Sequence, residues 1–98
     1  MLDLSSHHLT LVRAILNQYV PHARVVAFGS RVKGTAKPYS DLDLAIIANT
    51  PLSFSTRTRL KEAFLESDLP FMVDIADWHR LDPKFQALIQ ADGVDVVT

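Results

Sequence analysis

The sequence predicts an α/β or α+β fold in which a single layer of β-sheet is covered by helices on at least one face. Apolar runs of strand length alternate along the chain with segments whose apolar residues recur at helical spacing. Nearly half of the residues (48%) are hydrophobic and 21% are charged, which is typical of a globular protein. The length of 98 residues matches one domain, so we expect a single domain over residues 1–98.

The first half of the chain predicts a helix, a strand, a short helix and a second strand. Ser5 or Ser6 can cap the first helix, whose apolar residues share one face until a proline ends it. A β-branched and aromatic run follows and stops at a glycine. The second strand alternates at first and then becomes wholly apolar, as a central strand does near its buried end. We expect these elements at residues 5–19, 24–28, 30–33 and 41–47.

The second half predicts two more helices and two more strands. Ser53 or Ser55 can cap the first of these helices, and a proline precedes a strand with the sequence FMVDIA. Asp82 followed by Pro83 is typical of a helix start, because the aspartate caps the helix and proline fits its first position. The last helix is expected to stop at Gly93, before a short edge strand VDVV. The expected ranges are 53–68, 71–76, 83–92 and 94–97.

Composition and charge argue against several classes of protein. The 10 Lys and Arg residues nearly balance the 11 Asp and Glu residues, so we do not expect a large nucleic-acid-binding face. No apolar run reaches the roughly 18 residues that a membrane span needs. The N-terminus lacks the basic and apolar pattern of a signal peptide. The chain has no cysteine, which is compatible with the cytoplasmic location that we expect.

Two aspartates, Asp41 and Asp43, distinguish the second strand. Residues i and i+2 of a strand project from the same face, so both carboxylates would lie together while the intervening leucine enters the core. Like charges roughly 6–7 Å apart repel unless a cation lies between them. Asp74 interrupts the next apolar strand, where burial without a partner is costly. If the two strands are neighbours, the three carboxylates form a triad for two Mg²⁺ ions about 3.5–4 Å apart, as nucleotidyl transfer requires.

Asp77, three residues after Asp74, is the competing candidate for the third ligand. We expect it to lie past the end of the strand, near Trp78. An ordinary surface charge or a helix cap would explain it equally simply.

A turn with the sequence GSRVKG separates the first strand from the aspartates. Gly29 lets the backbone approach a phosphate where a Cβ would clash, and Ser30 can start a helix whose free N–H groups favour an anion. Arg31 and Lys33 add positive charge, either as phosphate contacts or as solvated side chains. Ser40 could position the loop before the aspartates, or it could be an ordinary turn serine. The spacing is neither that of a Walker loop nor GxGxxG.

Gly-Ser, ten residues and then Asp-Leu-Asp-Leu resembles the signature of the DNA polymerase β-type nucleotidyltransferase superfamily. With the downstream VDIADW, the chain is most similar to the minimal nucleotidyltransferases, the MNT or MntA-like group of prokaryotes. The resemblance implies a small mixed sheet with helices packed mainly on one face and two Mg²⁺ ions at the aspartates. It also implies ATP as the substrate, with its β- and γ-phosphates at the Gly-Ser turn. Members of the group pair with a small helical HEPN-type or substrate-binding partner, and some transfer AMP to a tyrosine of a partner toxin. The residues expected to bind nucleotide are Gly29, Ser30, Arg31, Lys33 and Ser40, and those expected to be catalytic and to bind metal are Asp41, Asp43 and Asp74.

Three functions are compatible with these residues. The first is a Mg²⁺-dependent nucleotidyltransferase that attaches AMP to a tyrosine of a helical partner toxin and thereby acts as its antitoxin. The second is a binding module that masks its partner stoichiometrically, although a pure binder has no need for carboxylates that repel one another. The third is nucleotidyl transfer to a small molecule, with a separate subunit that binds the substrate.

Overall fold

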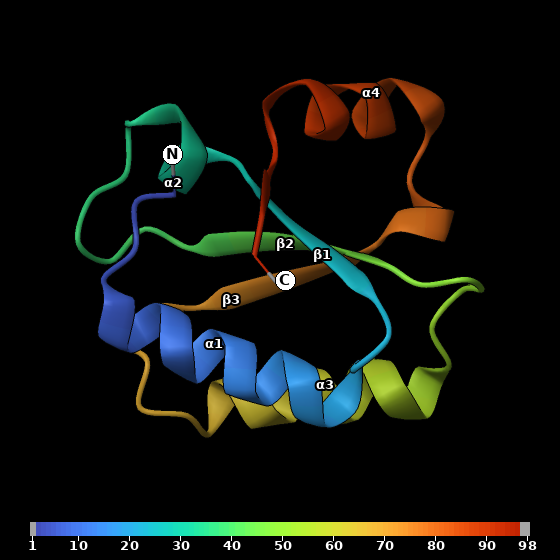
Figure 1. The fold of residues 1–98 in the computed structure, drawn as a ribbon, viewed down its shortest axis with the longest axis horizontal. Coiled ribbons are helices and arrows are strands. Elements are labelled where there is room, and N and C mark those ends of the chain that lie inside the picture. Colours follow the sequence, from blue (N-terminus) through green and yellow to red (C-terminus); the bar gives the residue numbers. More distant parts are fainter. Residues whose placement is uncertain (1, 97–98) are drawn as a thin grey trace.

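The computed structural model of the chain describes residues 2–96, in which four strands form one mixed sheet (Figure 1). The spatial order is β3-β2-β1-β4. Strand β2 pairs antiparallel with β1 and parallel with β3, and β4 pairs antiparallel with β1. The predicted mixed sheet and its short edge strand are confirmed, and Val97 lies outside the described residues. The strands are β1 (Arg24–Phe28), β2 (Leu42–Ile47), β3 (Val73–Asp77) and β4 (Val94–Asp95).

The helices begin at the caps that the sequence predicts. The side chains of Ser5, Ser53 and Asp82 each accept a hydrogen bond from a backbone N–H in the first turn. Helix α3 ends three residues earlier than expected, where the Ser67 hydroxyl donates to the Phe64 carbonyl and competes with helical bonding. None of the helices in residues 2–96 has the length and apolar content to cross a membrane. The helices are α1 (Ser6–Tyr19), α2 (Ser30–Lys33), α3 (Phe54–Leu65) and α4 (Pro83–Asp92), with a 3₁₀ turn η1 (Trp78–Arg80).

Most of the core lies between one face of the sheet and the helices α1 and α3, which run side by side below the sheet in Figure 1. Helix α4 lies on the opposite face, where Ile89 packs against Val26 and Ala45. The helices therefore cover mainly one face, as expected, and α4 with η1 covers part of the other. The main core includes Val12, Leu16, Val25, Ala27, Leu42, Leu44, Ile46, Leu60 and Phe64.

The alternation of β2 decides which side chains each face carries. Leu42, Leu44 and Ile46 are 0% exposed and point into the main core. Asp43 and Ala45 consequently point to the face that α4 covers, since successive strand residues alternate between faces. The half-buried Asp43 therefore lies on the less covered side of the sheet.

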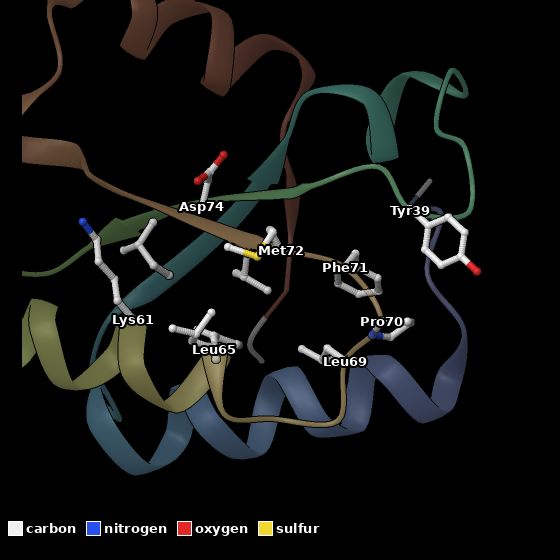
Figure 2. Close-up of a pocket in the computed structure, with 11 residues that line it drawn as sticks. Tyr39, Lys61, Leu65, Leu69, Pro70, Phe71, Met72 and Asp74 are labelled. Carbon is white, nitrogen blue, oxygen red and sulfur yellow. The ribbon is translucent and has the colours of Figure 1, made fainter.

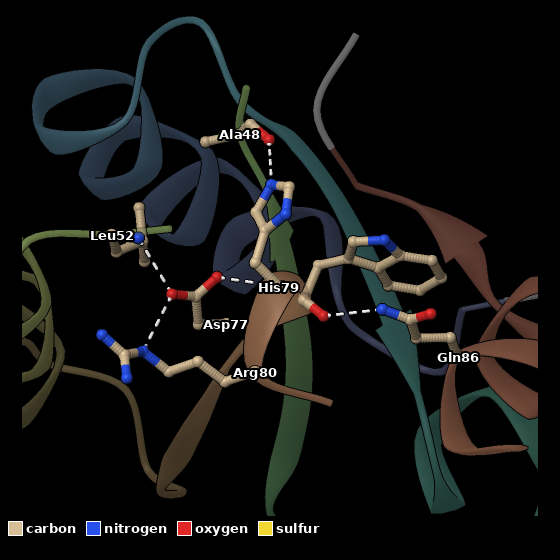
Figure 3. A network of polar contacts seen from close by, with 7 residues as sticks. Ala48, Leu52, Asp77, His79, Arg80 and Gln86 are labelled. Carbon is tan, nitrogen blue, oxygen red and sulfur yellow. Dashed lines mark hydrogen bonds and ion pairs between the residues drawn. The ribbon is translucent and has the colours of Figure 1, made fainter. Parts of the chain in front are cut away.

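Asp77 is buried, so the surface charge expected as one alternative is wrong (Figure 3). It is the last residue of β3 and does not lie past the end of the strand as expected, and it is only 5% exposed. Its carboxylate accepts hydrogen bonds from the backbone N–H groups of Leu52 at 2.9 Å and His79 at 3.2 Å, and it forms an ion pair with Arg80 at 3.3 Å. The alternative role as a cap is confirmed, because the bond to His79 caps η1. Asp77 thus connects the end of β3 to the loop before α3.

We expect Asp77→Ala to lower the free energy of unfolding by about 2–3 kcal/mol, because backbone donors would lose their acceptor. Asp95→Ala is the matched control: it removes an ion pair with Arg24 whose side chains are 61% and 55% exposed. An exposed pair of this kind contributes little to stability. Urea unfolding followed by circular dichroism measures both, and equal losses would contradict a structural role for Asp77.

Candidate active site

Strand β1 ends in a turn that requires glycine at its first position. Gly29 has φ 82° and ψ −153°, a conformation that a residue with a Cβ rarely adopts. A Cβ at this position would also collide with Oδ2 of Asp43. The Gly29 carbonyl accepts hydrogen bonds from the N–H groups of Val32 and Lys33, which folds the following residues into α2. The turn therefore closes directly against the aspartate, with Ser30 as the first residue of α2.

The three predicted acidic residues come from two neighbouring strands. Asp43 of β2 lies directly opposite Asp74 of β3 in the parallel register and opposite Phe28 of β1 in the antiparallel register. Asp41 precedes β2 and is exposed. Figure 2 shows Asp74 projecting from β3 on the side away from Leu65. The expectation that the two strands are neighbours is confirmed, and Asp43 and Asp74 share the face against which the Gly29 turn closes. Asp41 lies one residue before β2 and not within it as expected.

These carboxylates affect one another electrostatically. Burial raises the pKa of Asp43, and the charges of Asp74 and then Asp41 raise that pKa further. Each cause disfavours the ionised form of Asp43 in the free protein. A cation placed among the three side chains would remove this penalty, so the arrangement favours cation binding.

The donor set fits a hard cation only when other ligands complete the coordination. Within residues 2–96, no three His, Asp or Glu side chains converge closely enough to hold a metal ion by themselves. The triad therefore does not form an enclosed protein cage. Mg²⁺ commonly takes one or two carboxylates and completes its octahedron with water and substrate phosphate oxygens. Asp41, Asp43 and Asp74 are compatible with that mode of binding.

Arg31 is buried, so the solvated side chain expected as one alternative is wrong. Its side chain is only 6% exposed. Its Nε donates to the Ser40 carbonyl at 3.0 Å, and its two terminal nitrogens donate to the carbonyls of Asp3 at 3.0 Å and Pro38 at 3.2 Å. The guanidinium also stacks on Phe71, 4.2 Å from the ring centre. Each of the three nitrogens donates one hydrogen bond, which gives Arg31 a structural role, while the expected phosphate contact stays a prediction.

Ser40 and Lys33 lie where each could affect the site in a different way. The Ser40 hydroxyl accepts a hydrogen bond from the Lys37 N–H at 2.8 Å, and its carbonyl accepts one from Arg31. Ser40 thus positions the loop that leads to Asp41, which is the first of the two roles expected for it. Lys33 is exposed and lines a pocket together with Gly29 and Asp43. Its position is compatible with the expected phosphate contact.

Two pockets adjoin the aspartates. One, of about 620 Å³, follows the edge of β3 that faces away from β2 and includes Asp74 (Figure 2). Its rim carries Tyr39, Leu65 and Met72, which are 78%, 69% and 57% exposed. The other, of about 430 Å³, includes Asp43 and is bounded by α4. Asp43 and Asp74 therefore each line a different pocket.

Sequence reasoning did not place α4 at the site. Phe85, Leu88 and Asp92 of this helix line the second pocket. Their spacing of three and four residues puts them on one helical face, which is a signal that the sequence contains. What the sequence lacks is the information that this face lies beside Gly29 and Asp43, because that depends on how α4 packs across β1.

Comparisons with known proteins identify relatives of the chain in sequence and in fold. Residues 11–98 match the family model described as Polymerase beta, Nucleotidyltransferase. The chain is 57% identical over 89 residues to a probable protein adenylyltransferase MntA of Haemophilus influenzae, an alignment that covers 91% of this chain and 78% of that protein. A solved toxin–antitoxin structure with AMP-PNP matches the fold with a TM-score of 0.76 at 25% identity. The match covers 90% of this chain and 71% of the solved chain. A complex of a tri-AMPylated Shewanella oneidensis HEPN toxin with an MNT antitoxin shares the fold, with a TM-score of 0.72, 22% identity and coverages of 95% and 71%.

We expect Asp43→Asn to raise the melting temperature at pH 7 in the presence of EDTA. The pKa of Asp43 is raised, so the folded state keeps this proton at pH values where the unfolded state has lost it, and stability falls as the pH rises. The advantage of the variant should therefore vanish as the pH falls through about 3.9, the ordinary aspartate pKa. Thermal scans from pH 3 to pH 8 test this, with Asp68→Asn as an exposed control. A variant no more stable than the wild type at pH 7 would contradict it.

We expect Arg31→Lys to reduce the free energy of unfolding by about 2 kcal/mol, since an ammonium group cannot reach three carbonyls and stack on Phe71 at once. The control is Arg59→Lys on the exposed side of α3, which should change stability by less than about 0.5 kcal/mol. Urea unfolding measures both variants. Unchanged stability together with weakened ATP binding would instead indicate that Arg31 acts as a phosphate contact and not as a structural residue.

Proposed function

Because the chain belongs to the polymerase β nucleotidyltransferase family, we propose that it transfers AMP from ATP to a tyrosine of a helical HEPN-type partner and so acts as an antitoxin. The observation that carries the proposal is the register of the sheet. Asp43 lies directly opposite Asp74, on the face against which the Gly29 turn closes. An acidic pair beside a glycine turn is the arrangement that nucleotidyl transfer from a metal-bound triphosphate requires.

In the proposed reaction the chain orients two substrates. Gly29 and Ser30 hold the β- and γ-phosphates, and Lys33 adds positive charge beside them. Asp41, Asp43 and Asp74 would hold Mg²⁺, with two ions expected, and bound Mg²⁺ would make the acceptor hydroxyl more acidic and stabilise the leaving pyrophosphate. The tyrosine oxygen forms a bond to the α-phosphorus, and the bond from that phosphorus to the bridging oxygen of the β-phosphate breaks. Asp74 assists removal of the hydroxyl proton.

The similar proteins support the choice of nucleotide and partner. The Haemophilus influenzae relative is named as a protein adenylyltransferase, which favours AMP as the transferred group and a protein as the acceptor. The solved toxin–antitoxin structure contains AMP-PNP, an analogue of ATP. The Shewanella oneidensis complex pairs the same fold with an AMPylated HEPN toxin. A cytoplasmic location is part of the proposal and is compatible with a chain that has no cysteine.

Stoichiometric masking is the second candidate, and one observation favours it. The pocket along the edge of β3 has an exposed apolar rim formed by Tyr39, Leu65 and Met72. Such a surface is typical of a protein-binding site whether or not a reaction follows binding. The acidic pair distinguishes the two candidates, since only catalysis needs it.

We expect Asp43→Asn and Asp74→Asn each to lower AMP transfer by at least about 100-fold, because loss of a metal ligand should cost no less than loss of the groups that orient it. The assay uses a HEPN-type protein as the acceptor, Mg²⁺ and ATP labelled at the α-phosphate. Asp68→Asn, an exposed change in the loop after α3, is the control and should retain wild-type transfer. Equal labelling by the wild type and both site variants would sink the proposal.

The same proteins separate catalysis from masking. We expect the double variant Asp41→Ala/Asp43→Ala to bind the HEPN-type protein and fail to neutralise it. Co-expression and growth measure neutralisation, and co-purification measures binding. Full neutralisation by the double variant would establish masking as the mechanism.

A further inference from the structure

The pocket between α4 and the Gly29 turn is continuous with the candidate active site. It measures about 430 Å³, within the roughly 300–1,000 Å³ typical of small-ligand pockets. Gly29 and Asp43 line it, so two residues of the nucleotidyltransferase signature form one side. Phe85 and Leu88 of α4 form another. A ligand held by its phosphates at the turn would therefore meet an apolar surface nearby.

The apolar face of α4 is larger than core packing requires. Ile89 is 2% exposed and fills the space against Val26 and Ala45. Phe85 and Leu88 on the adjoining part of the helix are 40% and 63% exposed. An exposed apolar face beside polar residues commonly marks a binding site.

An aromatic pair gives this pocket a rigid wall. The rings of Phe28 and Phe85 meet edge to face, with centroids 5.6 Å apart and planes at 87°. Phe28 lies opposite Asp43 in the sheet, so the wall begins one strand away from the acidic pair. Aromatic and aliphatic surfaces of this kind bind flat rings by stacking and van der Waals contact.

The polar residues of the pocket match the two ends of a nucleotide. Lys33, four residues after Gly29, can attract a phosphate. Asp92, the last residue of α4, offers a hydrogen-bond acceptor for an exocyclic amino group. The apolar side chains between these charges suit an uncharged ring and not a phosphate chain.

From this lining we propose that the pocket binds the purine base of the nucleotide, which it recognises mainly through the ring faces that contact Phe85 and Leu88. The proposal rests on the proposed function, because it takes the phosphates to lie at Gly29. Stacking strength increases with ring area and depends little on the edge of the base. The chain should therefore prefer ATP and GTP over UTP, and any of these over inorganic tripolyphosphate, which has no base.

Calorimetric titration in Mg²⁺ with ATP, UTP and tripolyphosphate tests the pocket without a partner protein. Phe85→Ala and Leu88→Gln should each weaken ATP binding at least about 5-fold and leave tripolyphosphate binding within about 2-fold. Leu88→Gln introduces no charge and changes a side chain that is 63% exposed, so it preserves the fold if Phe85→Ala disturbs Phe28. Phe54→Gln, at a position 75% exposed on α3 and outside both pockets, should have no effect.

Leu65→Gln probes the competing pocket along β3. If it weakens ATP binding while Leu88→Gln does not, the base binds at the β3 edge and the inference is overturned. If the wild-type protein binds ATP no more tightly than tripolyphosphate, the base contributes nothing to binding. That result overturns the inference but not the proposed phosphate site. If neither ligand binds, the proposed function itself fails.

Discussion

The alternation of β2 is the constraint on which the rest of the site depends. Leu42, Leu44 and Ile46 are fully buried, and each such side chain stabilises the fold by about 1.5–3 kcal/mol relative to exposure. A shift of one residue in register would place these side chains on the opposite face and turn Asp43 into the core. The apolar residues therefore hold Asp43 beside Gly29 and Asp74, and their burial offsets the repulsion that its carboxylate experiences.

Arg31 extends this constraint to the loops around the strands. Its three hydrogen bonds join the segment before α1 to the loop before Asp41, and its stacking reaches Phe71, just before β3. The residues that lead into both acidic strands are thus connected through one buried guanidinium. Arg31 therefore supports the site by holding these loops in place, whereas Lys33, two residues later, is exposed.

The sequence predicts what depends on neighbouring residues. The bounds of β1, the caps at Ser5 and Asp82, and the alternation around Asp43 all follow from local spacing, and the structure has them in the expected places. The burial of Asp77 could not be predicted, because its main donor, Leu52, lies 25 residues away. The burial of Arg31 could not be predicted for the same reason, because a charge in a glycine turn gives no sign that carbonyls from other segments will surround it.

The two pockets adjoin different members of the acidic pair Asp43 and Asp74. Asp43, in central β2, lines the pocket toward α4, and Asp74, in edge strand β3, lines the pocket along the outer edge. A donor nucleotide on the α4 side and an acceptor side chain on the β3 side would therefore reach the pair without competing for space. The acceptor side has an exposed apolar rim that suits a protein, whereas the nucleotide side has a smaller cavity with an aromatic wall. Because the register sets these carboxylates side by side on neighbouring strands, each can face its own pocket while both contribute to the proposed reaction centre.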